Sequence, residues 1–477
     1  MFIDEHFETL DRSQISTADY ELALRHAPRI RFDAREPFLP SAVGFTVFRE
    51  EMDSYSFPRH LMLPEGAVCG IEYAIWWDWD IQHLYELEHI WVYLDAQERV
   101  VAAEASWHGG FHRMVTDSGD IPMEDSRVTV FSESGKHAFA PVRDWLIKRA
   151  DVTISGCGRD AGKAGVHVTS LFKGLITDRT PLNNQLVWTY LERHAFEPTF
   201  NYEKVFDLAQ APHVPWQNLA EWIPARIHWW TQRLYDQIPP HERRVIRIAH
   251  RGASAYAQEN SLAAIYKAAE LGADMVEVDV RLTADRVPVI FHDDSLKRLY
   301  GAAGMVSEFT LEELSRMTPD GHEPIVTLEA LVETCRSLHM GLYLDIKQIS
   351  MDSAQTMMDI VKRYNMMGGT IFGSFRPDWL AEIKANESQA MTSILFGSVH
   401  VNPVAQAQAI QCDYVHPCWE RFEAPHTLLT EHWLSSVRDT GLGVVCWHEE
   451  RPDVIRALQS LGVNAICSDQ PELLIPA

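Results

Sequence analysis

Three carboxylates in the second half of the chain have the types and spacing of a metal site. Glu277 and Asp279 lie two residues apart in the run MVEVDVRL, and residues two apart on a strand point to the same face. Asp345 stands near the end of a similar run, GLYLDIKQ. Carboxylate oxygens are the hard ligands that Mg²⁺ and Ca²⁺ prefer. The three residues are therefore candidate ligands of one divalent metal, either Ca²⁺ or Mg²⁺.

Cations and histidines accompany these carboxylates. Arg251 and Lys347 could neutralise a phosphoryl group, one with a planar fork of donors and the other as a point charge. His250 and His292 follow different apolar runs, and two histidines can serve as base and acid in a displacement at phosphorus. Taken singly, each such residue is more often a solvated or hydrogen-bonded side chain. Their recurrence at the ends of successive runs indicates one site that cleaves a phosphate ester.

The elements that would position these residues predict a (β/α)8 barrel. Helix-like stretches such as SLAAIYKAAELG and RPDVIRALQSLG alternate with short apolar runs. A barrel of this type usually needs about 250 residues, and its reactive side chains gather at the carboxyl ends of the strands. The run 287–294 is predicted to be an added hairpin or loop. The eight predicted barrel strands are 245–252, 275–282, 341–348, 369–375, 392–397, 412–419, 442–449 and 464–471.

Composition and charge limit the classes of function. The chain has 477 residues, 46% hydrophobic and 23% charged, which is ordinary for a folded protein. It carries 67 Asp and Glu against 42 Lys and Arg, a net charge of -25. Such a surface repels phosphate backbones, so we expect a small-molecule substrate and no nucleic-acid partner. The oligomeric state is left open.

The cysteines and the start of the chain favour a cytoplasmic protein. The seven cysteines have no CxxC spacing and are odd in number, which favours reduced thiols over a disulfide framework. The opening stretch MFIDEHFETLDRSQ is acidic and lacks the apolar core of a signal peptide. No run of about 18 apolar residues is present, so no transmembrane segment is expected.

The texture of the sequence changes near residues 236–246, DQIPPHERRVI, where two prolines precede a charged cluster. We therefore predict a linker at 236–246 between two domains. Residues 1–235 are expected to form a β-rich, sandwich-like accessory domain, because stretches such as LEHIWVYL alternate apolar and polar residues. The helical spacing of 218–235 gives this domain a helical tail. Residues 247–477 are expected to form the barrel.

The front half carries a second group of polar residues. Two interpretations stay open: a metal or carbohydrate site, since histidines and carboxylates alternate along predicted strands, or tryptophans in the core and histidines at the rim. Glu-His followed by His-Gly-Gly is faintly similar to necrosis-inducing toxin-like β-sandwich proteins. The stretch GCGRDAGKAG lacks the spacing and the Ser/Thr of a phosphate-binding loop, so we expect a flexible surface loop there. The group comprises His83, Glu86, Glu88, His89, His108, His112 and His137.

The second half resembles the glycerophosphodiester phosphodiesterases. The resemblance covers about 241–477 and rests on an ordered motif set. The opening block is IAHRGASAYAQENSLAAIYKAAELGADMVEVDVRLTADRVPVIFHDDSLKRL, and FTLEELSRM, PIVTLEALVE, LYLDIK, FGSF and GVNAICSDQPELL follow. The family implies a barrel hydrolase with one divalent metal that cleaves glycerophosphodiesters to glycerol 3-phosphate and an alcohol, a reaction of glycerol and lipid metabolism.

The resemblance also assigns roles residue by residue. By motif, His250 and His292 become the acid/base pair, and Arg251 grips the phosphate with Lys347 near it. Glu277 and Asp279 become metal ligands, and the family mechanism has a glycerol hydroxyl attack phosphorus to give a cyclic phosphate that water opens. Glu259 and Asn260 fall on the supporting Glu-Asn element.

Three departures from the family pattern bear on the substrate. Gln258 stands where the family usually has proline, and Asp345 where it usually has glutamate. The segment between His292 and Pro324 is short compared with members that carry an inserted capping domain. An open cleft would favour the alternative of a lysophospholipase D-like activity on bulkier lipids. A catalytically silent phosphodiester-binding protein is the third hypothesis.

Two aromatic residues follow predicted barrel strands. Phe375 and Trp447 could stack on a glycerol or a choline-like headgroup, because a quaternary ammonium binds aromatic faces. Both could equally be packing residues of the barrel rim. His448, beside Trp447, is expected to be a surface side chain.

Overall fold

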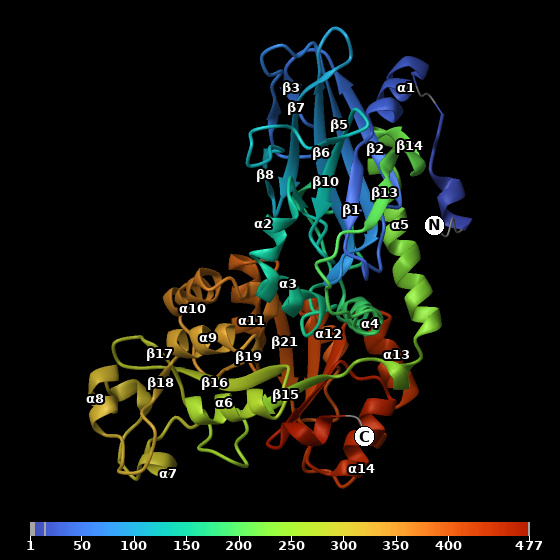
Figure 1. Cartoon of the computed structure of the whole chain (residues 1–477). Helices are drawn as coiled ribbons and strands as arrows, with labels where there is room; N and C mark the ends of the chain where they lie inside the picture. The colour runs from blue at the N-terminus through green and yellow to red at the C-terminus, as the bar shows by residue number, and fades with distance from the viewer. Residues whose placement is uncertain (1–4, 14–15, 476–477) are drawn as a thin grey trace. The chain divides into compact units, whose positions relative to one another are not determined.

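The computed structural model describes residues 5–13 and 16–475, so the first four residues and residue 14 of the acidic opening stretch lie outside it. The chain forms two compact units. Unit 1 comprises the residues up to Arg179 together with Leu186–Ile238, and unit 2 comprises Thr180–Gln185 together with the residues from Pro239 onward. Each unit has its own sheets (Figure 1).

Unit 2 contains the predicted barrel. Eight parallel strands form a ring that closes because β15 pairs with both β24 and β16. The fold-class prediction is confirmed for this half. In ring order the strands are β15 (Ile246–His250), β16 (Met275–Leu282), β19 (Gly341–Ile346), β20 (Thr370–Ser374), β21 (Met391–Phe396), β22 (Tyr414–Pro417), β23 (Gly443–Cys446) and β24 (Ala465–Ser468).

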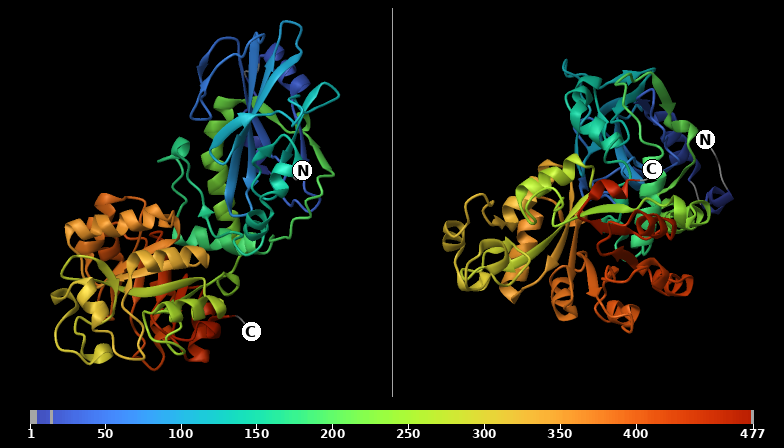
Figure 2. Two further views of the ribbon diagram at one scale, coloured as in Figure 1. Left: turned by 60° about the vertical axis from the view of Figure 1, so that its left-hand side comes forward. Right: turned by 90° about the horizontal axis from the view of Figure 1, so that it is seen from below.

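Helices alternate with these strands and form the outer layer of the barrel (Figure 2). Their starts are set by local chemistry. Ser261, Thr327, Asn402 and Thr430 each accept a hydrogen bond from a backbone N–H in the first turn. The helices are α6 (Leu262–Glu270), α9 (Leu328–Ser337), α10 (Met351–Arg363), α11 (Pro377–Asn386), α12 (Pro403–Ala409), α13 (Glu431–Arg438) and α14 (Pro452–Ser460).

An excursion follows the second barrel strand. β17 (Pro288–Ile290) pairs antiparallel with β16, and β18 (Val326–Thr327) pairs with β17. Between them lie α7 (Lys297–Tyr300) and α8 (Leu311–Arg316). The excursion has a small core of its own, so it is a compact addition to the barrel edge. The core residues include Phe291, Leu296, Val306 and Leu314.

Unit 1 is built from two sheets that face one another, which confirms the prediction of a mainly-β front half. Trp77 of the larger sheet stacks on His137 with ring centroids 4.7 Å apart and contacts Phe139 of the smaller sheet. In order, the larger sheet is β14 (His213–Pro215), β2 (Ala42–Phe48), β5 (Cys69–Trp79), β6 (His83–Leu94), β7 (Val100–Trp107) and β8 (Gly110–Arg113), with β12 (Gly165–Val166) on β6.

The smaller sheet and the helices complete unit 1. In order, this sheet is β11 (Phe139–Ala140), β10 (Arg127–Ser132), β1 (Arg29–Phe32) and β13 (Lys204–Asp207), with β9 (Met123–Glu124) on β10. A separate ribbon pairs β3 (Met52–Asp53) with β4 (His60–Leu61). The helices are α1 (Thr17–His26), α2 (Arg143–Ile147), α3 (Ala150–Cys157), α4 (Pro181–Glu192), whose first residues group with unit 2, and α5 (Trp216–Gln237).

The expectation of a flexible surface loop at GCGRDAGKAG is wrong. Cys157 and Ala161 are buried in this stretch. The backbone N–H of Gly162 donates to the Ile81 carbonyl over 2.9 Å, and that of Ala164 donates to the Gln82 carbonyl over 3.0 Å. The stretch is therefore fixed to the turn between β5 and β6.

Two further observations concern the cysteines and the helices. All seven cysteines lie among the described residues and are free thiols, and six of them are buried. Among the helices of residues 5–13 and 16–475, none is both long and apolar enough to cross a membrane.

Candidate active site

The three predicted metal ligands converge inside the barrel. Parallel pairing places Asp345 of β19 beside Asp279 of β16, and Glu277 lies two residues earlier on the same face. One oxygen from each carboxylate lies within 4.8 Å of the other two, and all three residues are fully buried. Glu277 Oε1 and Asp345 Oδ1 accept no hydrogen bond, and Asp279 Oδ1 has only the Lys347 ammonium as a neighbouring donor. Buried carboxylate oxygens without partners are costly, so the cluster fits a bound cation.

Two cations partly balance this negative charge. Lys347 forms a close ion pair with Asp345 and lies 3.2 Å from Asp279 Oδ1, and Arg251 Nε lies 3.3 Å from Asp279 Oδ2. Burial raises the pKa of Glu277 well above its usual value, and the neighbouring carboxylates raise it further. Burial also raises the pKa of Asp345 to about 6 against the opposing charge of Lys347. A divalent cation would favour the ionised form of all three carboxylates.

The His-Arg-Gly turn after β15 fixes the position of Arg251. Arg251 and Gly252 both have left-handed backbone conformations, with φ of 53° and 81°. A Cβ on Gly252 would lie 2.7 Å from Ala264, so only glycine fits the turn. The backbone N–H of Arg251 donates to Glu277 Oε2 over 3.0 Å. The turn therefore places the guanidinium and the first metal-ligand candidate together.

The Glu-Asn element supports the same residues. Arg251 donates to Glu259 Oε1 over 3.0 Å. The side-chain amide of Asn260 donates to Asp279 Oδ2 over 2.9 Å. Glu259 and Asn260 thus contact a cation and a carboxylate of the cluster, the positions that a supporting role requires.

His250 ends β15 and is held by a carboxylate that the sequence interpretation missed. Its Nδ1 lies 2.6 Å from Asp469 Oδ1, and Ser254 also donates to that oxygen over 2.8 Å. Burial raises the pKa of Asp469, but these hydrogen bonds outweigh it and hold the pKa at about 2. Because the ionised carboxylate only accepts, His250 donates from Nδ1 and its Nε2 is free to accept a proton. That Nε2 lies 3.9 Å from Glu277 Oε2.

His448, expected to be a surface side chain, is partly exposed, with 27% of its side chain accessible. Its ring stacks on His250 with centroids 4.5 Å apart and planes 9° from parallel. His448 Nδ1 lies 3.2 Å from Glu450 Oε1, and the same oxygen accepts the backbone N–H of Asp469. Burial opposes protonation of His448, but the Glu450 carboxylate outweighs it and raises the His448 pKa. His448 therefore packs against the base candidate.

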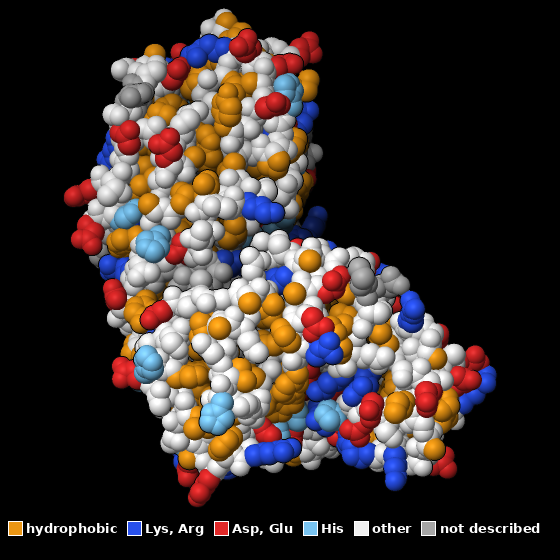
Figure 3. Space-filling model, turned by 180° about the vertical axis from the view of Figure 1, so that it is seen from behind, with side chains coloured by type: hydrophobic (Ala, Val, Ile, Leu, Met, Phe, Trp, Pro, Cys, Tyr) orange, Lys and Arg blue, Asp and Glu red, His pale blue; other side chains and the backbone are white. Residues whose placement is uncertain are grey.

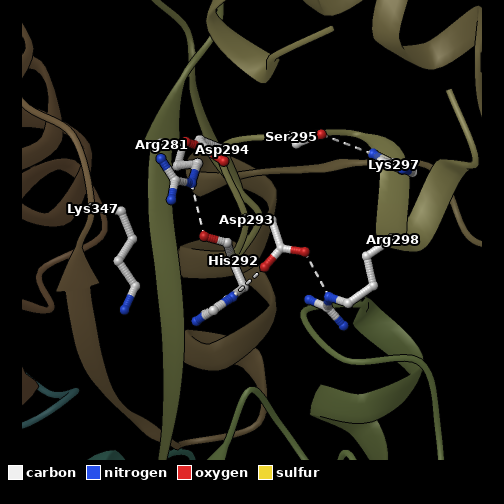
Figure 4. A pocket seen from close by; sticks show the side chains of 8 residues that line it. All are labelled: Arg281, His292, Asp293, Asp294, Ser295, Lys297, Arg298 and Lys347. Atoms are coloured by element: carbon white, nitrogen blue, oxygen red, sulfur yellow. Dashed lines mark hydrogen bonds and ion pairs between the residues drawn. The ribbon is translucent and has the colours of Figure 1, made fainter. Parts of the chain in front are cut away.

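His292 follows β17 in the excursion and belongs to a row of charged groups (Figure 4). Its Nδ1 is 2.6 Å from Asp293 Oδ1, and Asp293 Oδ2 accepts from Arg298 over 2.6 Å. Arg298 also donates twice to Glu259, over 2.9 and 2.7 Å. This row links His292 to Glu259, the partner of the Arg251 guanidinium. Arg298 was not predicted as a site residue.

A cavity of about 790 Å³ lies beside this row. Its lining is rich in cations, which suits an anionic substrate. Figure 3 shows one face of the molecule on which basic and acidic side chains gather around a hollow that contains a histidine, beside a band of apolar side chains. The residues that line the cavity are Arg281, His292, Asp293, Asp294, Ser295, Lys297, Arg298 and Lys347.

Phe375 and Trp447 follow β20 and β23 and lie near each other, with ring centroids 6.2 Å apart. The Lys347 ammonium lies 5.9 Å from the Phe375 ring centroid and 5.5 Å from that of Trp447. Trp447 also contacts His250, 5.5 Å away. Phe375 is 48% exposed, so its ring is available to a ligand.

Comparison with known proteins shows which family the second half of the chain resembles. A model described as the glycerophosphoryl diester phosphodiesterase family matches residues 250–473. The glycerophosphodiester phosphodiesterase of Caldanaerobacter subterraneus subsp. tengcongensis is 27% identical over 238 residues, which are 48% of this chain and 95% of that protein. The crystal structure of a glycerophosphodiester phosphodiesterase from Thermotoga maritima is 30% identical, with 48% of this chain and 96% of that one covered and a TM-score of 0.41.

The chain belongs to the glycerophosphoryl diester phosphodiesterase family. A structure of an Oleispira antarctica phosphodiesterase in complex with the product sn-glycerol-3-phosphate is also similar, at 25% identity and a TM-score of 0.43, with 50% of this chain and 96% of that one covered. The family match lies in unit 2, where the convergent carboxylates are found.

Asp469 is one of the site residues that the sequence interpretation missed, and its position in the sequence could have revealed it. It follows β24 directly, and the carboxyl ends of barrel strands carry the reactive groups. Arg298 and Glu450 had no such signal, because their contacts depend on how the loops fold.

The polar group of unit 1 divides into separate contacts. His89 lies 2.9 Å from the Ser56 hydroxyl, and His112 is 3.0 Å from the Phe139 carbonyl. His83 and Glu86 come together, and Asp80, which the sequence interpretation missed, completes their cluster. The remaining members have other partners: Glu88 with Ser106, His108 with Glu133, and His137 with Glu36.

Proposed function

We propose that unit 2 hydrolyses glycerophosphodiesters to glycerol 3-phosphate and an alcohol, with one divalent metal. One observation carries the proposal: in a chain of this family, three buried carboxylates, of which Glu277 and Asp345 each keep an oxygen without a partner, converge beside the free Nε2 of His250. Unit 1 is an accessory domain in this proposal. The free cysteines support a reducing, cytoplasmic compartment.

Glu277, Asp279 and Asp345 would hold the metal. When bound, Ca²⁺ or Mg²⁺ would act as a Lewis acid on a phosphoryl oxygen. Arg251 and Lys347, which already pair with these carboxylates, would bind the remaining phosphoryl charge. The phosphoryl group would therefore lie between the carboxylate cluster and the two cations.

The two histidines would move the protons. His250 accepts the proton of the attacking hydroxyl at Nε2, because Asp469 fixes the proton on Nδ1. A glycerol hydroxyl of the substrate attacks phosphorus, the bond to the alcohol oxygen breaks, and His292 gives that oxygen a proton. The resulting cyclic phosphate is opened by water with the proton transfers reversed. Phe375 and Trp447 would contact the glycerol or the headgroup.

The test is release of glycerol 3-phosphate from glycerophosphocholine and glycerophosphoethanolamine with Ca²⁺, with Mg²⁺ and with EDTA. We expect release that needs a metal and that His250→Ala abolishes. Release that is unchanged by EDTA contradicts the metal site. Release that is unchanged by His250→Ala contradicts the mechanism.

A second candidate is hydrolysis of lysophospholipids. The exposed Phe375 ring beside Trp447 favours it, because an apolar ring at the site can contact an acyl chain. The same assay with lysophosphatidylcholine separates the two: faster turnover of the lipid than of glycerophosphocholine would favour this candidate. Metal binding without turnover of either substrate would favour a phosphodiester-binding protein.

A further inference from the structure

The turn between β5 and β6 of unit 1 brings three ligand-type side chains together. Asp80 follows β5 directly, and His83 and Glu86 belong to the first residues of β6. One ligand atom from each lies within 4.8 Å of the other two. His83 Nε2 is 3.7 Å from Asp80 Oδ1 and 3.8 Å from Glu86 Oε2. Both distances are too long for hydrogen bonds.

The backbone fixes which nitrogen of His83 faces the carboxylates. His83 Nδ1 lies 2.8 Å from the Tyr85 carbonyl oxygen. A carbonyl only accepts, so Nδ1 is the donor and the neutral ring presents the bare lone pair of Nε2. That lone pair lies near one oxygen of each carboxyl group, Asp80 Oδ1 and Glu86 Oε2, without a hydrogen bond to either. A histidine that donates its other N–H to a backbone carbonyl is the usual arrangement of a metal ligand.

A buried oxygen of the same cluster has no hydrogen-bond partner. Asp80 is fully buried, and its Oδ2 has no hydrogen-bond partner. Its Oδ1 accepts from the Gln82 N–H over 2.7 Å and pairs with the Lys136 ammonium at 3.1 Å. Lys136 thus contributes one positive charge to the cluster, and it leaves Asp80 Oδ2 without a partner. A bound cation would supply that partner.

The turn is held rigidly from outside. The Ile81 N–H donates to the Gly135 carbonyl over 2.8 Å, and the Ile81 and Gln82 carbonyls accept from Gly162 and Ala164. The side chains are therefore positioned before any ion binds, which lowers the cost of binding. The Glu86 side chain remains 20% exposed, so an ion can reach the cluster from solvent.

We propose that Asp80, His83 and Glu86 form a binding site for a divalent transition-metal ion in unit 1. One imidazole nitrogen with two carboxylate oxygens suits Zn²⁺ or Mn²⁺ better than the all-oxygen set of the barrel does. Three protein ligands leave coordination positions for water. The site is distinct from the barrel cluster, and the proposal does not depend on the reaction proposed for unit 2.

The test uses the full chain, freed of metal with EDTA and dialysed, then equilibrated with Zn²⁺ and analysed for bound metal. At a Zn²⁺ concentration near the wild-type dissociation constant, we expect Glu86→Gln and Asp80→Asn each to bind one Zn²⁺ ion fewer than wild type. The affinity of this site for Zn²⁺ should fall by about 10²-fold or more. The same difference is expected in a Glu277→Gln background, where the barrel cluster is impaired. The test of the unit 1 site therefore gives the same answer even if the barrel cluster binds no metal.

Matched controls come from an exposed carboxylate–histidine pair of the same unit. Asp53 and His60 lie 2.7 Å apart in the ribbon formed by β3 and β4, with side chains 88% and 53% exposed. Asp53→Asn and His60→Gln should bind as much Zn²⁺ as wild type. If Asp80→Asn does not fold by circular dichroism, the partly exposed Glu86→Gln carries the test. Zn²⁺ binding by folded Glu86→Gln that matches wild type in stoichiometry and affinity overturns the proposal.

Discussion

The barrel and the front unit each gather three ligand-type side chains within 4.8 Å, but they do so in different ways. In the barrel, Asp279 and Asp345 come from neighbouring strands that are distant in sequence. In unit 1, Asp80 lies in the turn of one hairpin, and His83 and Glu86 lie at the start of its second strand. The barrel cluster therefore depends on the tertiary pairing of strands, whereas the hairpin cluster depends on one local turn and the segments that hold it.

Ligand type and charge compensation also differ. The barrel presents three carboxylates that two cations, Lys347 and Arg251, partly neutralise. The hairpin presents two carboxylates and an imidazole beside one cation, Lys136. Hard oxygen ligands favour Ca²⁺ and Mg²⁺, whereas a mixed set favours transition metals. Clusters with similar spacing of ligand atoms can therefore suit different metals and different roles.

The largest expected effect separates reaction from binding in the barrel. His250→Ala and His292→Ala should each lower kcat by about 10²-fold or more, the usual contribution of a general acid or base. Metal affinity should change far less, because neither residue is among the three carboxylate ligands. The measurement is kcat on glycerophosphocholine together with the metal dissociation constant.

The control for these variants is His322→Ala, which changes an exposed histidine of the excursion. It should keep the wild-type rate. If His250→Ala or His292→Ala also keeps that rate, the assigned proton transfers are wrong and the site of unit 2 is only a binding site.

A smaller effect tests whether the barrel cluster holds its metal through Asp345. Asp345→Asn removes one hard ligand and the close ion pair with Lys347. The Ca²⁺ or Mg²⁺ concentration for half-maximal activity should rise at least tenfold, since even residues that only orient ligands contribute 10–100-fold to affinity, and excess metal should partly restore the rate. Asp378→Asn, at an exposed carboxylate paired with Arg376, is the control. If excess metal restores nothing, Asp345 is not a ligand.

Asp469→Asn should change the pH dependence of the reaction. Burial lowers the pKa of His250, and the hydrogen bond to Asp469 partly opposes that shift. Removing the carboxylate should therefore lower the His250 pKa further and move the acidic limb of kcat to lower pH. The plateau rate should fall by at least roughly tenfold, because the uncharged amide no longer stabilises the imidazolium that forms. An acidic limb that stays in place or moves to higher pH would show that Asp469 does not act through His250.

The barrel could be predicted because its signals are periodic and local. Each strand is a short apolar run, and each adjoining helix has its own spacing and stop signal, as in RPDVIRALQSLG. The loop at 156–165 was predicted wrongly because its glycines suggested flexibility. Its backbone is in fact paired with the β5–β6 turn, a tertiary contact that composition does not reveal.

The candidate site was predictable to a similar degree. Glu277 and Asp279 share a strand face, and the strand-end rule with the family resemblance placed Asp345 beside them. The stacking of His448 on His250 could not be predicted, because it depends on the pairing of β15 with β24 and of β24 with β23. In unit 1, Asp80 was missed because only the turn brings it to His83.

The smallest expected effect concerns stability and uses a buried histidine outside both clusters. His213 of unit 1 lies beside β2, and its Nδ1 donates to the Ala211 carbonyl over 2.8 Å. Burial lowers its pKa to about 4. The folded unit therefore holds the ring neutral, while the unfolded chain takes up a proton below about pH 6.5. The contribution of this neutral ring to the free energy of unfolding is complete above pH 6.5 and is lost as the pH falls toward 4. At pH 5 the loss is about 2 kcal/mol.

The variant His213→Asn keeps a donor for the carbonyl and removes the titrating group. It should be less stable than wild type at pH 7 through lost packing, but it should lose about 2 kcal/mol less between pH 7 and pH 5. Native-state hydrogen exchange of the β2 amides measures this local stability without requiring the two units to unfold together. His60→Asn, at an exposed ring, should follow wild type. If His213→Asn loses as much stability as wild type, the acid sensitivity of unit 1 must come from other groups, among them the carboxylates and histidine of the hairpin cluster.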